Sequence, residues 1–319
     1  MNIVFFGSGK FAIHPFEAII LGKHNLLSVV TQPDRKSGRG LGYDSTPIKK
    51  IAVEKGIGVY QPRDINSKGS IDYLKTLNAD LFVVISYGQI LSEEVLSIPG
   101  MLAINAHASL LPKYRGAAPV NWAIINGEDR TGVTVIKMER RMDSGPMILQ
   151  KEIVIDKDET SVILEEKLSF LAADVLKEAV YNIGNNNYRL IPQEENNVTF
   201  APKLKKSDGL IDWDKPAEEI RDLIRGSQPW PGAFTYYHGK LLKVYRAEIL
   251  QHGAISREVS NGEIIGFDRQ GILVATAKNV LVLKELQLEA KRIMSAVEFI
   301  SGHKIHPGDR FDKKKLQAR

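Results

Sequence analysis

Three polar residues with complementary chemistry follow two apolar runs of the chain. Asn105 and His107 lie two residues apart at the end of the run MLAIN (101–105), so on a strand their side chains project from the same face. Asp143 follows the run TGVTVIKM (131–138), in the turn sequence DSG. Alone, each is more often a local cap than a catalyst. Together they can stabilise a tetrahedral oxyanion and move a proton from an attacking amine to a leaving nitrogen.

Metal and thiol chemistry find no comparable support. The chain has 319 residues and no cysteine, which excludes disulfides, thiolate-metal sites and a cysteine nucleophile, and fits the cytosol. The pair His303-x-x-His306 lies in a basic tail without acidic or sulfur co-ligands. We therefore predict that the chain binds no metal.

A glycine-rich segment near the N-terminus offers a second interpretation. GSGKFA (7–12) matches the G-x-G-x-x-G/A pattern of dinucleotide-binding folds, and Asp34 lies near the expected position of a ribose ligand. However, Asp34 lies within QPDRKSGRG and not at a strand end, and no other motif carries hydride-transfer chemistry. We therefore interpret Gly7 and Gly9 as residues that permit a tight turn from strand to helix, and keep a nicotinamide enzyme as the alternative.

The first half of the chain alternates two patterns that would position these residues. Short, nearly continuous apolar runs are typical of strands covered on both faces, and the amphipathic stretches between them are typical of helices. The alternation predicts right-handed βαβ units and a mostly parallel, doubly wound α/β sheet, whose carboxyl edge borders the ligand crevice. The predicted strands are 2–6, 26–32, 80–86, 101–105 and 131–138, and the predicted helices are 11–22, 47–56, 67–78, 117–126 and 161–184.

The last third of the chain has a different pattern. A polar stretch over 190–207 lacks periodicity and is interpreted as a linker. After one helix near 216–226, five short runs separated by glycine-containing turns predict a small oligonucleotide-binding-like (OB-like) β-barrel. We therefore expect a catalytic domain over 1–189 and a barrel domain over 208–319. The predicted barrel strands are 233–237, 241–250, 262–267, 271–276 and 279–288.

Charge also distinguishes the two parts of the chain. Residues 1–202 hold 22 Lys and Arg against 23 Asp and Glu, whereas residues 203–319 hold 21 against 15, so the net charges are −1 and +6. A basic excess is typical of a surface for a polyanion, although domains that bind none also carry one. No apolar run approaches the ~20 residues that cross a bilayer, and MNIVFFGSG lacks the features of a signal peptide, so we expect no membrane role.

Longer segments resemble a known enzyme family. INAHASLLPKYRGAAPVNWAI (104–124), with SYGQIL (86–91) before it and MDSG (142–145) after it, closely resembles the methionyl-tRNA formyltransferases. The shorter N-x-H…D pattern resembles all enzymes that take a formyl group from 10-formyltetrahydrofolate. The resemblance covers nearly the whole chain and is weakest over 250–300. Further segments that resemble this family are TQPDRKSGRG (31–40), TPIK (46–49), TFAPKLKK (199–206), IDW (211–213), IRGSQPWPGAFT (224–235) and HPGDRF (306–311).

The resemblance implies a role for each matching residue. Asn105, His107 and Asp143 would be the catalytic residues of a Rossmann-like formyltransferase domain. Arg39 would contact the acceptor end of a tRNA from a mobile loop, and the alternative is a solvated basic loop. The residues implied to line the folate site are Ser109, Leu110, Leu111 and Pro112, together with Tyr87 and Gly88 in the pterin pocket.

The implied activity is transfer of the formyl group of 10-formyltetrahydrofolate to the amino group of initiator methionyl-tRNA, for translation initiation. We expect a cytoplasmic monomer whose basic barrel holds the acceptor arm. The nearest alternative is a formyltransferase of the same fold that acts on an amino sugar or a purine precursor, or a relative that hydrolyses the folate. A non-catalytic RNA-binding module is a further alternative, but it would leave the Asn, His and Asp set unexplained.

Overall fold

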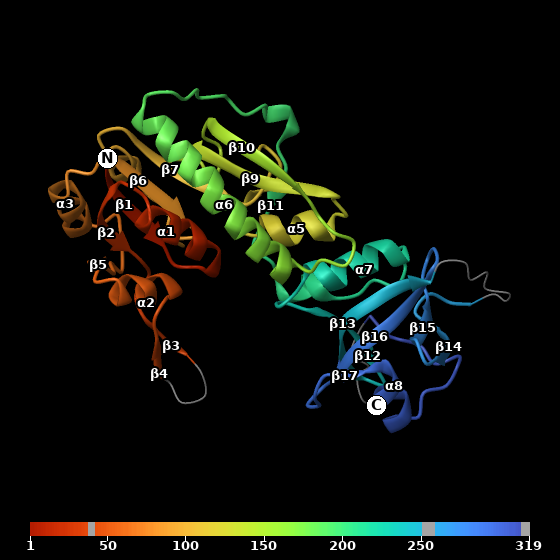
Figure 1. Ribbon diagram of the computed structural model, residues 1–319. Coiled ribbons are helices and arrows are strands. Elements are labelled where there is room, and N and C mark those ends of the chain that lie inside the picture. The colour runs from red at the N-terminus through yellow and green to blue at the C-terminus, as the bar shows by residue number, and fades with distance from the viewer. Residues whose placement is uncertain (38–41, 251–258, 314–319) are drawn as a thin grey trace. The chain divides into compact units, whose positions relative to one another are not determined.

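The computed structural model describes residues 1–37, 42–250 and 259–313. The chain forms two compact units (Figure 1). Two short segments from the first 164 residues belong to the second unit, so the division does not fall at a single point in the sequence. Unit 1 comprises Met1–Pro119, Arg130–Val154 and Glu165–Pro202, and unit 2 comprises Val120–Asp129, Ile155–Leu164 and Lys203–Arg319. Among the described residues, no helix is long and apolar enough to span a bilayer.

A seven-stranded sheet forms the centre of unit 1, in the order β10-β9-β7-β6-β1-β2-β5. The five strands from β7 to β5 in this order are parallel, whereas β9 is antiparallel to both of its neighbours. The mostly parallel sheet predicted from the sequence is therefore confirmed. The strands are β1 (Asn2–Gly7), β2 (Asn25–Val30), β5 (Val59–Tyr60), β6 (Leu81–Ile85), β7 (Leu102–His107), β9 (Arg130–Lys137) and β10 (Met147–Val154).

Helices follow the strands as predicted. In Figure 1 the long helix α6 runs across the sheet beside α1, and the Ser169 hydroxyl of α6 donates a hydrogen bond to the Phe11 carbonyl at 2.8 Å. Side chains at the helix starts accept backbone N–H groups that have no partner within the helix: Thr46 accepts from Lys49 and Ser67 from Ser70. The helices are α1 (Ile13–Ile20), α2 (Pro47–Glu54), α3 (Lys68–Thr76), α4 (Glu93–Leu96), α5 (Pro119–Ile125) and α6 (Ser161–Gly184).

Two small strand pairs lie outside the main sheet. Strand β3 (Arg35–Ser37) pairs with β4 (Gly42–Asp44), and the pair extends away from the sheet in Figure 1. Strand β8 (Arg115–Gly116) pairs in parallel with β11 (Phe200–Ala201), which lies within the stretch interpreted as a linker. The second pair therefore brings residues near 200 back to the segment that follows β7. The three short 3-10 helices are η1 (Lys10–Ala12), η2 (Glu195–Asn197) and η3 (Lys206–Gly209).

The glycine-rich segment after β1 forms a tight turn against the end of β6. The backbone N–H groups of Ser8 and Gly9 both donate to the Ser86 carbonyl at 3.2 Å. A Cβ at Gly7 would lie 3.2 Å from the Ile85 carbonyl oxygen and 2.6 Å from a ring atom of Phe5, so only glycine fits there. The interpretation as a tight turn is confirmed, and the two N–H groups that would cradle a phosphate already have a partner.

Asp34, the residue considered as a ribose ligand, is also engaged within the protein. Its carboxylate accepts hydrogen bonds from Lys49 Nζ at 2.6 Å and Gln61 Nε2 at 2.9 Å. Lys49 first, and then Gln61, hold the pKa of Asp34 below its ordinary value. These contacts explain why an acidic residue occurs here without any nucleotide chemistry.

Unit 2 is built on an antiparallel sheet in the order β12-β13-β16-β15-β14, with β17 paired to β16. All five strands predicted from the alternating runs are present, within two residues of their expected ends. The strands are β12 (Ala233–Tyr237), β13 (Lys240–Leu250), β14 (Ile264–Asp268), β15 (Gly271–Ala275), β16 (Val280–Leu288) and β17 (Met294–Ser295), and the helices are α7 (Ala217–Gly226) and α8 (Ala296–Gly302).

A segment near the C-terminus joins the two edges of this sheet. Asp312 forms a backbone bridge with Tyr236 of β12, and Arg310 forms one with Glu263, next to β14. Between them, Phe311 is 2% exposed and stacks on Trp213 with ring centroids 5.4 Å apart. The bridges close the sheet into a barrel, in agreement with the barrel predicted from the sequence.

This closure yields a test of stability. Phe311→Ala should lower the free energy of unfolding of unit 2 by about 3–5 kcal/mol, because it removes a buried ring from the centre of the core. All three tryptophans lie in unit 2, so urea unfolding followed by tryptophan fluorescence reports on it. The control is Phe267→Ala, since Phe267 is 39% exposed and should contribute less than about 1 kcal/mol. Equal losses in both variants would contradict a barrel closed by Phe311.

Candidate functional site

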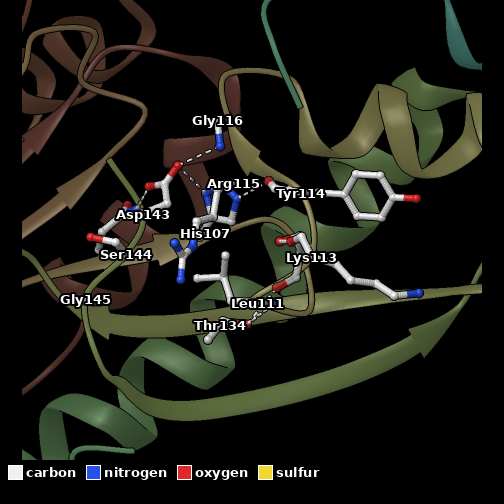
Figure 2. Close-up of polar contacts among 12 residues, drawn as sticks. His107, Leu111, Lys113, Tyr114, Arg115, Gly116, Thr134, Asp143, Ser144 and Gly145 are labelled. Carbon is white, nitrogen blue, oxygen red and sulfur yellow. Dashed lines mark hydrogen bonds and ion pairs between the residues drawn. The ribbon is translucent and has the colours of Figure 1, made fainter. Parts of the chain in front are cut away.

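The three residues selected from the sequence converge at one edge of the unit 1 sheet. Asn105 and His107 lie at the carboxyl end of β7, where Asn105 pairs with Val84 of β6 and His107 pairs with Thr134 of β9. Asp143 lies in the turn between β9 and β10, and Figure 2 shows its carboxylate directed toward His107 and Gly116. The convergence predicted for the strand ends is therefore present in the structure.

His107 is held between a carbonyl and a carboxylate. Its Nε2 lies 2.9 Å from the Tyr114 carbonyl oxygen, and because a carbonyl can only accept, this nitrogen carries a proton. Its Nδ1 lies 3.6 Å from Asp143 Oδ2, which is longer than a hydrogen bond but within range of an ion pair. The side chains of His107 and Asp143 are only 7% and 12% exposed. Nδ1 is thus the ring atom that can exchange a proton beside a carboxylate.

Asp143 is fixed by contacts to both of its carboxylate oxygens. The Gly116 N–H donates to Oδ2 at 2.9 Å, and Asn105 Nδ2 donates to Oδ1 at 3.4 Å. The backbone of Asp143 has a φ of +51°, in the left-handed region that non-glycine residues seldom adopt. Such a conformation persists only where the surroundings impose it.

The small pair β8–β11 supplies the N–H group that Asp143 accepts. Gly116 has a φ of +130°, and a Cβ there would lie 2.6 Å from the Ala201 carbonyl oxygen. The Arg115 N–H donates to the Thr199 carbonyl at 2.9 Å, and the Ala118 N–H donates to the Ala201 carbonyl at 3.1 Å. These bonds fix the backbone on either side of Gly116, so its N–H points at the carboxylate.

The DSG turn is closed against the end of β9. A Cβ at Gly145 would lie 1.8 Å from the Lys137 carbonyl oxygen, so only glycine permits this approach. The Ser144 hydroxyl donates to the Arg141 carbonyl at 2.9 Å. These contacts restrict the path of the turn, which carries the Asp143 side chain.

Two functional candidates were not found by sequence reasoning. Gln193 donates to the carbonyls of Asp143 and Gly145, and Arg115 donates to Gln193. Both side chains are buried, at 9% and 3% exposure. Arg115 lay within the resembling stretch but had no assigned role, and Gln193 lay in a polar stretch that carries no periodic signal.

The residues expected to line a folate site begin two positions after His107. The Ser109 hydroxyl donates to the Lys113 carbonyl at 2.7 Å, and the Leu111 N–H donates to Thr134 Oγ1 at 3.1 Å. Gln150 Nε2 donates to the Leu111 carbonyl at 3.0 Å. The segment over 109–112 thus satisfies these polar groups internally, and the partly exposed side chains of Leu110 and Pro112 present apolar surface.

Tyr87 and Gly88 follow β6 at the same edge of the sheet. The Tyr87 ring is 2% exposed and packs edge-on against Phe6, and burial raises the pKa of its hydroxyl, so the ring belongs to the core. Gly88 has a φ of +90°, and a Cβ there would lie 3.9 Å from the Gln32 side chain. Gln32 Nε2 and the Tyr87 hydroxyl are buried and have no hydrogen-bond partner among the described residues.

The remaining positions considered from the sequence are Arg39 and the pair His303 and His306. Arg39 falls outside the described residues. His303 stacks on Phe299 with ring centroids 4.2 Å apart and lies with its Nδ1 3.0 Å from the Phe299 carbonyl oxygen. Within the described ranges, no group of three or more His, Asp and Glu side chains has an arrangement that would hold a metal ion.

The assembled groups fit acyl transfer to an amine. An amide donor and an imidazole can bind an oxyanion. A buried carboxylate beside the imidazole can orient the ring and stabilise the positive charge of an imidazolium. Both ring nitrogens and both carboxylate oxygens are placed by backbone groups or neighbouring side chains. The site therefore needs little reorganisation before the reaction.

Family comparisons match both units of the chain. The family model described as formyl transferase matches residues 1–180, and the model described as formyl transferase, C-terminal domain, matches residues 203–304. The methionyl-tRNA formyltransferase of Caldanaerobacter subterraneus subsp. tengcongensis is 42% identical over 311 residues, which are 97% of this chain and 99% of that protein. The enzyme of the same name from Clostridioides difficile is 42% identical over 308 residues, with the same coverage.

A solved structure shares the fold at lower identity. WlaRD, a sugar 3N-formyl transferase crystallised in the presence of dTDP and 5-N-formyl-THF, superposes with a TM-score of 0.66 over 92% of this chain and 99% of that chain. The two sequences are 18% identical. This likeness supports the fold, but at 18% identity it says nothing about which acceptor this chain uses.

The closed DSG turn yields a prediction for stability. Gly145→Ala should lower the free energy of unfolding of unit 1 by about 3 kcal/mol, because its Cβ would collide with a backbone oxygen that cannot move aside. Gly69→Ala is the control: a Cβ at Gly69 meets no atom within 4 Å, and the change should stay within about 1 kcal/mol. Urea unfolding followed by circular dichroism measures both. A Gly145→Ala protein as stable as the control would show that the turn has room to relax.

Proposed function

The chain belongs to the formyl transferase family, and on that premise we propose that it transfers a formyl group from 10-formyltetrahydrofolate to the amino group of methionyl-tRNA. The main support for this proposal is how much of the chain resembles its relatives. Relatives named methionyl-tRNA formyltransferase are about two-fifths identical over 97% of the chain, across both units. We further propose that the acceptor is the initiator tRNA, that the enzyme is a monomer, and that it works in the cytoplasm.

The catalytic roles follow from the geometry of the trio. The methionyl amine attacks the formyl carbon, a C–N bond forms, and the carbonyl oxygen becomes an oxyanion. We assign Asn105 Nδ2 to donate to this oxyanion, and the imidazolium that His107 becomes on taking the amine proton to stabilise it by charge, since both lie at the carboxyl end of β7. One N–H of the Asn105 amide faces Asp143, which leaves the other for the substrate.

Proton transfer completes the reaction. The attacking amine must lose a proton, and N10 of the folate must gain one as its bond to the formyl carbon breaks. We assign this transfer to His107: its Nδ1 accepts the amine proton and then passes it to N10, while Asp143 Oδ2, 3.6 Å away in a largely buried setting, stabilises the imidazolium. The Tyr114 carbonyl keeps the ring in one orientation through Nε2. The products are formyl-methionyl-tRNA and tetrahydrofolate.

The folate site is proposed on the same edge of the sheet. The apolar side chains of Leu110 and Pro112 suit the flat rings of a folate. Gln32 Nε2, beside Gly88, is a buried donor without a partner in the described residues, and a pterin presents ring nitrogens and an oxygen that accept such bonds. The buried Tyr87 ring supports this wall from behind rather than contacting the ligand.

We propose that the tRNA is held mainly by charge. Residues 203–319 carry a net charge of +6, and their described part includes a closed antiparallel barrel of the predicted OB-like type, a kind of fold that binds oligonucleotides. Neutralising phosphates releases counterions, so this part of the binding should weaken as salt rises. A sugar acceptor would offer no such dependence.

The activity itself has a direct test. The protein is incubated with 10-formyltetrahydrofolate and methionyl-tRNA, and formyl-methionine is measured. His107→Ala and Asp143→Ala should each lower kcat by roughly two to four orders of magnitude with little change in folate affinity. The control is His24→Ala, because His24 directly precedes β2 and therefore lies at the amino ends of the parallel strands, away from the catalytic residues at their carboxyl ends. Product formed on an amino sugar but not on the tRNA would reject the acceptor, and full activity in His107→Ala would reject the assignment.

Arg39 supplies a second test, of tRNA binding. Arg39→Ala should raise KM for methionyl-tRNA and leave folate affinity unchanged, because the segment RKSGRG is cationic and suits a polyanion. Removing one phosphate contact should also reduce the slope of log affinity against log salt by about one. Lys23→Ala removes one exposed charge of the same unit elsewhere and should leave both quantities unchanged. Equal loss of folate and tRNA binding in Arg39→Ala would contradict the role.

A further inference from the structure

Gln193 is the group that fixes the backbone of the catalytic turn. We infer that it is a positioning residue for Asp143, acting through the two carbonyl groups that flank Ser144. The inference rests on the proposed function, since it concerns the same reaction. It assigns a catalytic consequence to a residue 50 positions away along the chain from the carboxylate that it controls.

The contacts form a clamp around the DSG turn. Gln193 Nε2 donates to the Asp143 carbonyl at 2.8 Å and to the Gly145 carbonyl at 2.8 Å. One amide nitrogen thus uses both of its N–H groups on carbonyls two residues apart. The clamp holds the backbone of Asp143 itself, so the direction of its side chain depends on this amide.

The orientation of the amide is determined by its surroundings. Gln193 Oε1 accepts from Arg115 Nε at 2.9 Å, and a guanidinium can only donate. A flipped amide would place its oxygen against two carbonyl oxygens and its N–H groups against an arginine. Gln193 therefore occupies a site that only a side chain with two donors and one acceptor at this reach satisfies.

Arg115 connects the clamp to the other side of the carboxylate. Its side chain is 3% exposed and holds Gln193, while the next residue, Gly116, donates its N–H to Asp143 Oδ2 at 2.9 Å. The preceding residue, Tyr114, offers the carbonyl oxygen that lies 2.9 Å from His107 Nε2. Figure 2 shows the stretch from Tyr114 to Gly116 running past both His107 and Asp143. A closed circuit of contacts thus joins Asp143, Gln193 and the backbone that orients His107.

The clamp on the backbone matters because, apart from the bond from the Gly116 N–H, the contacts of the carboxylate are long. Its hydrogen bond from Asn105 is long at 3.4 Å, its distance to His107 is 3.6 Å, and its backbone adopts a left-handed conformation. Without the clamp, the two carbonyls would lose buried partners and the turn would shift. A shift of about 1 Å at a catalytic group can lower turnover about a hundredfold while substrate affinity is kept.

Gln193→Glu is the sharpest single substitution. It keeps the size of the side chain and an acceptor for Arg115, but it replaces both donors by an oxygen that the two carbonyls repel. We expect kcat to fall roughly 10- to 100-fold, with KM for folate and for methionyl-tRNA within about threefold of the wild-type values. The control is Glu195→Gln: Glu195 is 64% exposed and contacts the same arginine from the solvent side at 3.2 Å. Its kcat should stay within about twofold of the wild-type value.

A double variant separates positioning from a general loss of structure. If Gln193 acts through the Asp143 carboxylate, then adding Gln193→Glu to Asp143→Ala should lower single-turnover rates by less than about threefold more. If Gln193 merely supported the fold, the reductions in rate caused by the two single substitutions would be independent and would multiply in the double variant. Full multiplication, or an unchanged kcat in Gln193→Glu, would overturn the inference, and so would a change confined to KM.

Folding and function are checked in the same series. If Gln193→Glu does not fold, Gln193→Met tests the loss of both donors without a charge, and failure of both variants to fold would mark Gln193 as a stability residue and overturn the inference. A wild-type protein that forms no formyl-methionyl-tRNA would instead reject the proposed function. An active wild-type protein with an equally active Gln193→Glu variant would reject the positioning role alone.

Discussion

The hydrogen bond from the Gly116 N–H to the Asp143 carboxylate is the contact on which the arrangement of the site depends. It joins the segment after β7 to the turn after β9, so the same backbone that faces His107 also directs the carboxylate. A backbone donor at 2.9 Å holds this carboxylate oxygen in a nearly buried position, and an N–H group of the backbone cannot change its charge. The rest of unit 1 holds the segment after β7 and the turn after β9 in fixed positions relative to each other.

Several otherwise unrelated features follow from that requirement. Gly116 and Gly145 are glycines because a Cβ at either position would meet a backbone oxygen at 2.6 Å or 1.8 Å. Strand β11 returns to β8 because Gly116 must be held from its outer side. Unit 1 accordingly extends to Pro202, so a fragment ending at 189 would lack both β11 and Gln193. The domain boundary proposed at 189 stays a prediction, and the dependence of the site on β11 and Gln193 is directly relevant to it.

The buried elements and the three catalytic residues could be predicted from the sequence because each has a local signal. Nearly continuous apolar runs mark β1, β6 and β7, and polar residues at the ends of such runs mark Asn105 and His107. Strand β10 was missed because its residues are alternately exposed and half-buried at an edge of the sheet. Gln193 has no local signal at all: its role arises from contacts 48 to 78 residues away in the chain. Closure of the barrel by Phe311 and its neighbours was missed for the same reason.

The most direct measurement is a crystal structure of the chain with 5-formyltetrahydrofolate, in which the formyl group sits on a neighbouring nitrogen of the folate and does not react. The account predicts N10 of the folate within about 3–4 Å of the Asn105 and His107 side chains, with the Gly116 to Asp143 hydrogen bond intact. A folate bound with N10 more than about 8 Å from both side chains, or an Asp143 turned away from His107 in the complex, would contradict it.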